Sequence, residues 1–275
     1  MIRSFSAPFF LVAVLAAANP ALAQIPSAKP QHTGPSGPIY DWTVTALIGL
    51  AWGGPEFMAD DIVSPSCPCD ASEVNSFDRG VVGWDSEGYA TASDFAVALS
   101  VVAPFALDAL ETQRNGAPWS GFADDALVIS RSILISGAVQ EAVKLLTQRP
   151  RPRLYGIDES DPALDDHEEY VSFYSGHTTT AFSAGMSYAT LYALRHPDSS
   201  SRWMVYGGAM ALGTTVGILR IQAGSHFPTD VILGAIMGTA FGVAIPRLHH
   251  RDEPPSFGLA VEPEGAYVTY SKMLP

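Results

Sequence analysis

The stretch Asp125–Pro152, DALVISRSILISGAVQEAVKLLTQRPRP, shows the pattern that decides the fold of this chain. Residues 125–146 are rich in Ala, Leu and Ile and do not alternate between apolar and polar side chains, so they predict a helix rather than a strand. The Arg-Pro pairs that follow end this helix, because proline lacks the N–H group that a helix interior needs. The same character recurs in five other segments, which are 41–53, 94–110, 178–195, 203–219 and 229–245.

The apolar segments predict an all-α fold, a bundle of about six helices with the active site at one end. We expect this domain over residues 39–246. The remainder, 247–275, is expected to be a linker and a tail. In that tail the runs 257–260 and 266–270, flanked by Pro, Glu and Gly, indicate a small hairpin.

Several helix starts carry sequence signals. Ser93 and Asp94 are expected to cap the second helix, and Asp124 and Asp125 place negative charge at the amino end of the third. Pro228 suits the first turn of the sixth helix.

The amino terminus has the layout of a secretory signal peptide over residues 1–23, with Arg3, an apolar run at 9–18 and a small-residue cleavage site at 21–23. An uncleaved anchor is the alternative. Residues 24–38 are rich in Pro, Gly and Ser, which predicts a flexible leader. We therefore expect an exported, periplasmic protein.

The helix lengths leave open whether the bundle spans a membrane. The uncharged runs 178–194 and 203–219 reach about 25 Å at 1.5 Å per residue, below the roughly 30 Å of a bilayer core. Packing of the helices against one another explains this without lipid, and we favour that interpretation. A membrane-embedded or membrane-associated bundle is the alternative. The sequence indicates no oligomeric state.

Net charge excludes one class of partner. The 275 residues contain 28 acids and 15 bases, for a formal charge of −13. Nucleic-acid binders need a basic face to meet phosphates, so we expect no nucleic acid as partner. The sequence shows no cluster of metal-ligating residues, and we expect neither a metal nor another cofactor.

Three clusters of polar residues nevertheless lie at the ends of apolar helices. They are Lys144 with Arg151, then Ser175-Gly176-His177, and then Arg220 with His226 and Asp230. Alone, each has an ordinary explanation as helix-end cations, a serine cap or a surface pair. Together they offer fixed cations, helix N-terminal N–H groups, two histidines and a carboxylate, which suits a tetrahedral oxyanion such as phosphate. The set predicts a phosphoryl-transfer site.

These clusters resemble the three motifs of the type 2 phosphatidic acid phosphatase family, whose superfamily includes bacterial acid phosphatases and vanadium-dependent haloperoxidases. Lys144, Arg151 and Pro152 match Lys, six residues, Arg-Pro. Tyr174–His177 matches Pro-Ser-Gly-His, with Tyr174 in place of proline. Leu219–Asp230 matches Ser-Arg, five residues, His, three residues, Asp, with Leu219 in place of serine. The departures change the stiffness of one loop and remove one hydroxyl donor.

The resemblance implies a metal-independent phosphatase. His226 would attack phosphorus and form a phosphohistidine, with Asp230 hydrogen-bonded to its other ring nitrogen. His177 would protonate the leaving alcohol and then activate water. The implied phosphate-binding groups are Lys144, Arg151, Arg220 and the backbone N–H groups of Ser175 and Gly176.

Substrate and reaction leave alternatives. The expected substrate is a phosphorylated small molecule or lipid, including lipid phosphates and isoprenoid diphosphates. A vanadate-dependent haloperoxidase is the first alternative. Orthovanadate distinguishes the two, because it should inhibit a phosphatase but activate halide oxidation by a haloperoxidase. A non-enzymatic helical binding protein is the second.

Two features lie outside the motifs. Cys67 and Cys69 are expected to form a tight local disulfide in an oxidising compartment, with unpaired thiols as the alternative. The acidic run Asp158–Glu169 is interpreted as a soluble loop, or else as a lid that screens anionic substrates. His249 and His250 are expected to be solvated linker residues.

Overall fold

The computed structural model describes residues 38–53, 62–67, 69–158, 160–251, 256–262 and 265–271. The predicted signal peptide at 1–23 lies outside the described residues, as does the predicted leader apart from Pro38.

All six predicted helical segments are helices, each longer than predicted, and the all-α fold class is confirmed. They are α1 (Pro38–Gly53), α3 (Glu87–Arg114), α4 (Trp119–Thr147), α5 (Gly176–Arg195), α6 (Ser201–Gln222) and α7 (Pro228–Arg251). Short 3₁₀ turns lie at Ala71–Glu73, Arg79–Val81, Pro152–Leu154, Pro162–Asp165 and His167–Tyr170. The predicted hairpin is formed by β1 (Ser256–Glu262) and β2 (Gly265–Ser271), which pair antiparallel.

Two predicted helix starts are wrong. Ser93 and Asp94 lie inside α3, because this helix begins at Glu87. Asp124 and Asp125 likewise lie inside α4, which begins at Trp119. In both cases the helix begins in turns that precede its predicted apolar segment. The hydrophobic pattern of the sequence marks only the apolar part of the helix.

The predicted limits of α7 are correct at one end only. Pro228 is its first residue, as expected for a proline that occupies a first turn. The helix then continues to Arg251, through residues that were predicted as a linker. His249 and His250 therefore belong to a helix end, where their polarity is compatible with helical backbone.

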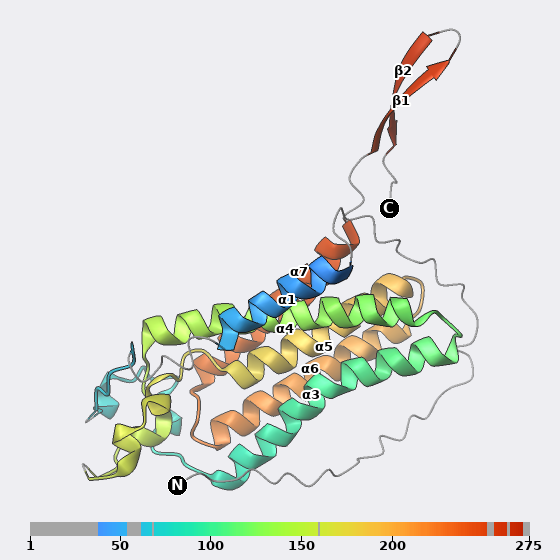
Figure 1. Ribbon diagram of the computed structural model, residues 1–275. Helices are drawn as coiled ribbons and strands as arrows, with labels where there is room; N and C mark the ends of the chain where they lie inside the picture. Colours follow the sequence, from blue (N-terminus) through green and yellow to red (C-terminus); the bar gives the residue numbers. More distant parts are fainter. Residues whose placement is uncertain are drawn as a thin grey trace.

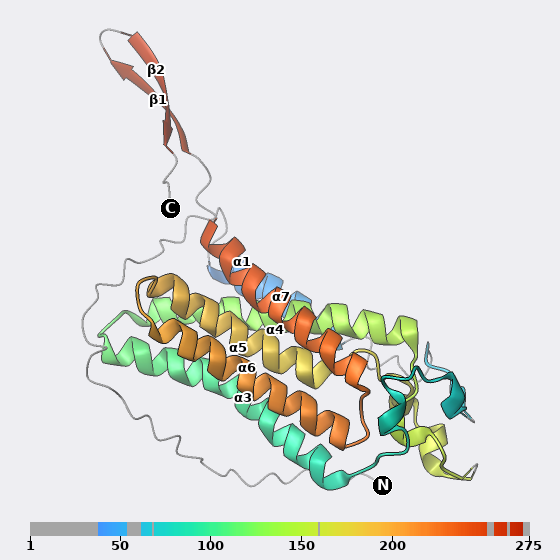
Figure 2. The ribbon, with the colours of Figure 1, turned by 180° about the vertical axis from the view of Figure 1, so that it is seen from behind.

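α5 lies at the centre of the bundle. Both views place it between α4 and α6, and it contacts α3, α4, α6 and α7 (Figures 1 and 2). α1 packs on α4. The main apolar core is shared by α4 and α5, with Ile129, Ala184 and Leu191 among its buried members.

Two glycines let α7 approach α5 at backbone distance. A Cβ atom at Gly238 would lie 2.5 Å from the carbonyl oxygen of Thr179, and one at Gly234 would lie 2.8 Å from that of Ser175. Any side chain at these positions would force the helices apart. This close packing brings the start of α7 against the start of α5, where two of the motifs lie.

Four helices, α3, α4, α6 and α7, are long and apolar enough to cross a membrane. Only 17% of the most apolar part of α3 and 22% of that of α6 and of α7 is buried in the protein. The apolar side chains exposed on these three helices include Phe95, Leu99, Val102, Leu107, Leu110, Trp203, Met204, Met210, Ile218, Ile232, Ile236 and Leu248. Packing within the bundle does not cover them, so the expectation of a bundle without lipid is not supported, and we treat the chain as membrane-embedded.

The connections at one end of the bundle form a small layer of their own. Val63, Leu154, Tyr170 and Val171 make a buried apolar cluster there, against which Cys67 packs. Cys67 and Cys69 form the predicted disulfide. The layer lies beyond the starts of α5 and α7 and beyond the ends of α4 and α6, at the left in Figure 1.

Candidate active site

The three motifs meet at that end of the bundle. α4 and α6 end there, with Lys144 and Arg220 in their last turns, and α5 and α7 begin there (Figure 1). Direct contacts tie the motifs together: the backbone N–H of Ser175 donates to the carbonyl oxygen of Asp230 at 3.2 Å. The structure therefore brings together all eight residues assigned from the sequence, at the end of the bundle where a site was expected.

His226 is held in one orientation by a backbone carbonyl. Its Nδ1 lies 2.7 Å from the carbonyl oxygen of Ser172 and 3.8 Å from Oδ2 of Asp230. A carbonyl oxygen only accepts, so Nδ1 carries the hydrogen and Nε2 keeps its lone pair. The expected hydrogen bond from His226 to Asp230 is thus replaced by one to Ser172, with Asp230 close by.

Asp230 instead organises the residues around the histidine. Its Oδ1 accepts from Arg149 Nη1 at 2.5 Å, and its Oδ2 accepts from Ser172 Oγ at 2.6 Å and from the Phe227 N–H at 2.9 Å. Ser172 therefore supports His226 with its carbonyl group while its hydroxyl is held by Asp230. This makes Asp230 a residue that positions the acceptor of His226.

Burial lowers the pKa of His226 well below its usual value, and the positive charges of Arg220, Arg151 and Lys144 lower it further. His226 is only 2% exposed. The imidazole is consequently neutral at neutral pH, which is the state that a nucleophilic nitrogen requires.

Among the described residues, each motif cation forms one ion pair, at 3.3 to 3.5 Å. Lys144 Nζ lies 3.5 Å from Glu141 Oε2, Arg151 Nη2 lies 3.3 Å from Glu168 Oε2, and Arg220 Nη1 lies 3.5 Å from Asp94 Oδ1. The Nε atoms of Arg151 and Arg220 are buried without a hydrogen-bond partner. Buried unsatisfied donors are costly, so these guanidinium groups are suited to an anion that satisfies them.

The start of α5 differs in one respect from the expected phosphate cradle. Ser175 caps the helix, its Oγ accepting from the Thr178 N–H at 3.4 Å. Its own N–H is occupied by the carbonyl group of Asp230. The N–H groups of Gly176 and His177 belong to the first helical turn, where no intrahelical acceptor exists.

Gln140 explains how the loop before α5 is held despite the tyrosine in place of proline. Its Nε2 donates to the carbonyl oxygen of Tyr174 at 3.0 Å. Its Oε1 would lie 3.1 Å from a Cβ atom at Gly176, a tight contact that only a small shift of the Gln140 side chain would relieve. Tyr174 itself is buried, at 1% exposure. Packing of its ring thus accompanies the Gln140 contact.

His177 pairs with a residue that the motifs do not contain. Its Nε2 lies 3.0 Å from Oδ1 of Asp94, which is on α3. Burial, followed by the charge of Arg220, lowers the pKa of His177 to about 4. A phosphate dianion beside His177 would favour its protonated form and raise this value.

Sequence reasoning also missed Arg149 and Asp78. Arg149 Nη2 donates to Asp78 Oδ2 at 2.8 Å while its Nη1 holds Asp230 and, at 2.9 Å, Thr229 Oγ1. Asp78 is fully buried and also accepts from the Thr229 N–H at 3.0 Å. Arg149 is one of the six residues between Lys144 and Arg151, which the first motif does not specify. In the sequence it resembles any cation at a helix end, and only its contacts in the structure show its place in the site.

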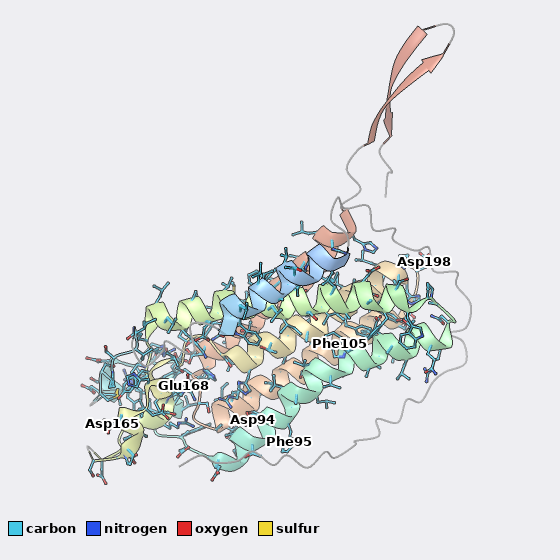
Figure 3. The ribbon with its side chains drawn as sticks, viewed as in Figure 1. Asp94, Phe95, Phe105, Asp165, Glu168 and Asp198 are labelled. Atoms are coloured by element: carbon cyan, nitrogen blue, oxygen red, sulfur yellow. A yellow bond between two sulfur atoms is a disulfide. The ribbon has the colours of Figure 1, made fainter. Side chains whose placement is uncertain are left out.

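Two residues of the acidic run between the first two motifs form ion pairs with arginines. Glu168 pairs with Arg151, and Glu169 forms a two-pronged ion pair with Arg153. Figure 3 shows Asp165 and Glu168 at the same end of the molecule as Asp94. The simple interpretation as a soluble loop is therefore incomplete, because two of its carboxylates hold arginines beside the site.

Metal ligation is not apparent in the part of the chain that the structure describes. Among those residues, no group of three or more His, Cys, Asp or Glu side chains is placed to hold a metal ion. A metal-independent reaction stays a prediction.

Comparison with known proteins supports the resemblance that the motifs indicate. Residues 125–254 match the profile of the PAP2 superfamily. Lipid phosphate phosphatase 1 of Arabidopsis thaliana is 26% identical over 169 residues, covering 51% of each chain. Lipid A 1-phosphatase of Rhizobium johnstonii is 29% identical over 115 residues, covering 41% of this chain and 43% of that protein. This chain thus spans about half the length of these relatives.

Among solved structures, a transmembrane PAP2-type phosphatidylglycerolphosphate phosphatase from Bacillus subtilis has a TM-score of 0.41 at 20% identity, covering 77% of this chain and 93% of that one. The family assignment rests on the sequence match, which includes all three motifs. Residues 125–254 thus match the PAP2 superfamily, which confirms the resemblance that the three motifs indicate.

Proposed function

We propose that this protein is a phosphatase that hydrolyses phosphate monoesters of membrane lipids through a phosphohistidine on His226. The observation that carries the proposal is the state of His226: neutral, with Nδ1–H bound to Ser172 and Nε2 unprotonated, close to three cations that are only weakly neutralised. A neutral nucleophile beside an anion site is what phosphoryl transfer needs.

In the first step, the lone pair of His226 Nε2 forms a bond to phosphorus while the bond from phosphorus to the alcohol oxygen breaks. Protonated His177 gives its proton to that oxygen. Lys144, Arg151 and Arg220 hold the other phosphate oxygens and stabilise the charge that develops on them. The N–H groups at the start of α5 add further donors.

In the second step, His177 takes a proton from water as the water oxygen attacks phosphorus. The bond between phosphorus and Nε2 breaks, so that inorganic phosphate leaves and both histidines return to their starting states. The carbonyl group of Ser172 keeps Nδ1–H in place throughout, which fixes the nitrogen that reacts.

A lipid substrate is supported by the position of the site. The motifs lie at the ends of helices α4, α6 and α7, which are long and apolar enough to span a bilayer, so a phosphate group at a membrane surface would lie at their level. Two relatives are named for lipid phosphate and lipid A.

We further propose that the motif end faces the extracytoplasmic side. The Cys67–Cys69 disulfide lies in the layer of connections at this end, and disulfides persist in oxidising compartments. The predicted signal peptide agrees with this orientation. Labelling of Glu87→Cys in whole cells by a membrane-impermeant maleimide tests it: labelling only after lysis would contradict it.

The proposed function is tested with the purified full chain in detergent, assayed on phosphatidic acid. His226→Ala is expected to lower turnover by at least about 1,000-fold, because no other residue replaces the nucleophile. His250→Ala, at the far end of α7, serves as the matched control and should retain wild-type activity. Comparable activity in His226→Ala and wild type would rule out the proposed mechanism.

A further inference from the structure

Ser93 and Asp94 on α3 contact the motif residues although no motif includes them. Asp94 Oδ1 lies 3.0 Å from His177 Nε2 and 3.5 Å from Arg220 Nη1. Ser93 Oγ accepts from the same Arg220 Nη1 at 3.1 Å. Both residues precede the stretch 125–254 that matches the family. α3 therefore contributes a part of the site that the family match does not cover.

The two neighbours have different surroundings. Ser93 is fully buried and its hydroxyl donates to the carbonyl oxygen of Ala90 at 2.7 Å, so it is fixed by the bundle. The side chain of Asp94 is 58% exposed. An exposed carboxylate has no need of a partner, and its contact with two site residues at once is not explained by the stability of the fold.

We propose that Asp94 is a positioning residue for His177: its carboxylate orients the imidazole ring and favours the protonated ring that donates to the leaving oxygen. This inference rests on the proposed function. It adds to the site a second histidine–carboxylate pair, which serves the leaving group as the residues around Asp230 serve the nucleophile.

Asp94 opposes the effect that the neighbouring positive charges have on the protonation of His177. Arg220 on α6 and Lys144 on α4 disfavour the protonated ring, and His226, between α6 and α7, is a further titratable neighbour. Asp94 on α3 is the group among these that favours protonation. Replacing its charge with a neutral amide leaves the cations unopposed, so His177 holds its proton only at lower pH.

The same carboxylate has a second effect on the site. Because it lies against Arg220, it competes with an incoming phosphate group for that cation. Asp94→Asn is therefore expected to change two measurements in opposite directions: inorganic phosphate binds more tightly, and a substrate that needs a protonated leaving group reacts more slowly.

The experiment compares Asp94→Asn with wild type in the purified full chain. An alkyl phosphate monoester has a poor leaving group that needs a proton, and p-nitrophenyl phosphate has a good one that does not. The ratio kcat/KM is measured because it reports steps up to formation of the phosphoenzyme and not its hydrolysis. Glu87→Gln, an exposed acid on the same helix with no motif contact among those described, is the matched control.

We expect Asp94→Asn to lower kcat/KM for the alkyl phosphate by about 10- to 100-fold and for p-nitrophenyl phosphate by less than about 3-fold. The alkaline limb of the alkyl phosphate profile should move to lower pH, and the inhibition constant of inorganic phosphate should fall. Glu87→Gln should leave all of these unchanged.

Equal losses on the two substrates would overturn the inference, since they would indicate general damage to the site. If the wild-type protein is active and Asp94→Asn has the same kcat/KM values, pH profile and phosphate inhibition constant, the inference is overturned and the proposed function stays intact. A wild-type protein that hydrolyses neither substrate would overturn the proposed function, and the inference with it.

Discussion

The two ends of the helical bundle both contain arginines that are at least partly buried, but they neutralise them differently. At the far end, Arg195 Nη2 lies 2.7 Å from Asp108 Oδ1 and 2.8 Å from Glu111 Oε2, and its Nη1 contacts Asp125. At the motif end, Arg220 has one carboxylate, that of Asp94, at 3.5 Å. Figure 3 shows the two ends, with Asp94 near one and Asp198 near the other.

This difference separates a structural charge cluster from a binding site. Three carboxylates on α3 and α4 contact the two Nη atoms of Arg195, which joins those helices to the end of α5. These carboxylates neutralise the positive charge of Arg195. Buried Nε atoms without a hydrogen-bond partner occur at both ends, in Arg195 as well as in Arg151 and Arg220, so the difference lies in the carboxylates. Arg151 and Arg220 each form one ion pair among the described residues, at 3.3 and 3.5 Å, so the motif end has positive charge to offer an anion. The neutralisation of the arginines thus distinguishes the two ends.

The largest effect is expected from breaking the far cluster. Arg195→Met leaves three partly buried carboxylates without their cation, so it should lower the free energy of unfolding by about 3–5 kcal/mol. Activity per folded molecule should stay within about 3-fold of wild type. Thermal unfolding in detergent measures the first effect, with Arg202→Met at the same end as control. A stable but inactive Arg195→Met would contradict the separation of the two ends.

Removing a motif cation should lower activity strongly and stability only slightly. Arg220→Ala is expected to lower kcat/KM about 100- to 1,000-fold, because one guanidinium group that stabilises the transferred phosphoryl is lost. Its unfolding temperature should change little, since the carboxylate left behind belongs to the exposed Asp94. Steady-state kinetics and thermal unfolding of the same preparation test both. Loss of stability without loss of activity would place Arg220 with the structural arginines.

A smaller effect is expected at Ser172. Ser172→Ala removes the hydroxyl that donates to Asp230 but keeps the carbonyl group that holds His226. We expect about a 10-fold loss of kcat/KM, close to the value of one hydrogen bond to a charged group. Ser136→Ala, a buried serine that bonds only within α4 in the described contacts, is the control. Equal losses of kcat/KM in Ser172→Ala and Ser136→Ala would show that the hydrogen bond to Asp230 does not contribute to activity beyond the effect of removing any buried serine hydroxyl.

Helical segments and motif residues were predictable from the sequence because both leave local patterns. Long apolar runs predicted six helices, and motif spacing identified residues such as His226 and Arg220. The polar first turns of α3 were missed, since exposed polar residues are compatible with a loop as well as with a helix. That error also hid Asp94, which was interpreted as a cap and instead contacts His177.

Contacts made by the backbone or by distant segments were not predictable. The acceptor of His226 is the carbonyl group of Ser172, and any residue type provides such a group. Asp78 reaches Arg149 from a segment about 70 residues earlier, a pairing that no spacing rule contains. Membrane embedding was underestimated because the helices extend beyond their apolar runs, so that lengths taken from those runs were too short.

The central claim is that His226 forms a covalent bond to phosphorus. Wild-type protein, His177→Ala and His226→Ala are each incubated with ³²P-labelled p-nitrophenyl phosphate, whose leaving group needs no proton from His177. The samples are quenched in alkali and digested, and the labelled peptide is sequenced. We predict an alkali-stable, acid-labile label on the peptide that contains His226, retained in His177→Ala and missing in His226→Ala. A label on another residue, or one that persists in His226→Ala, would contradict the mechanism.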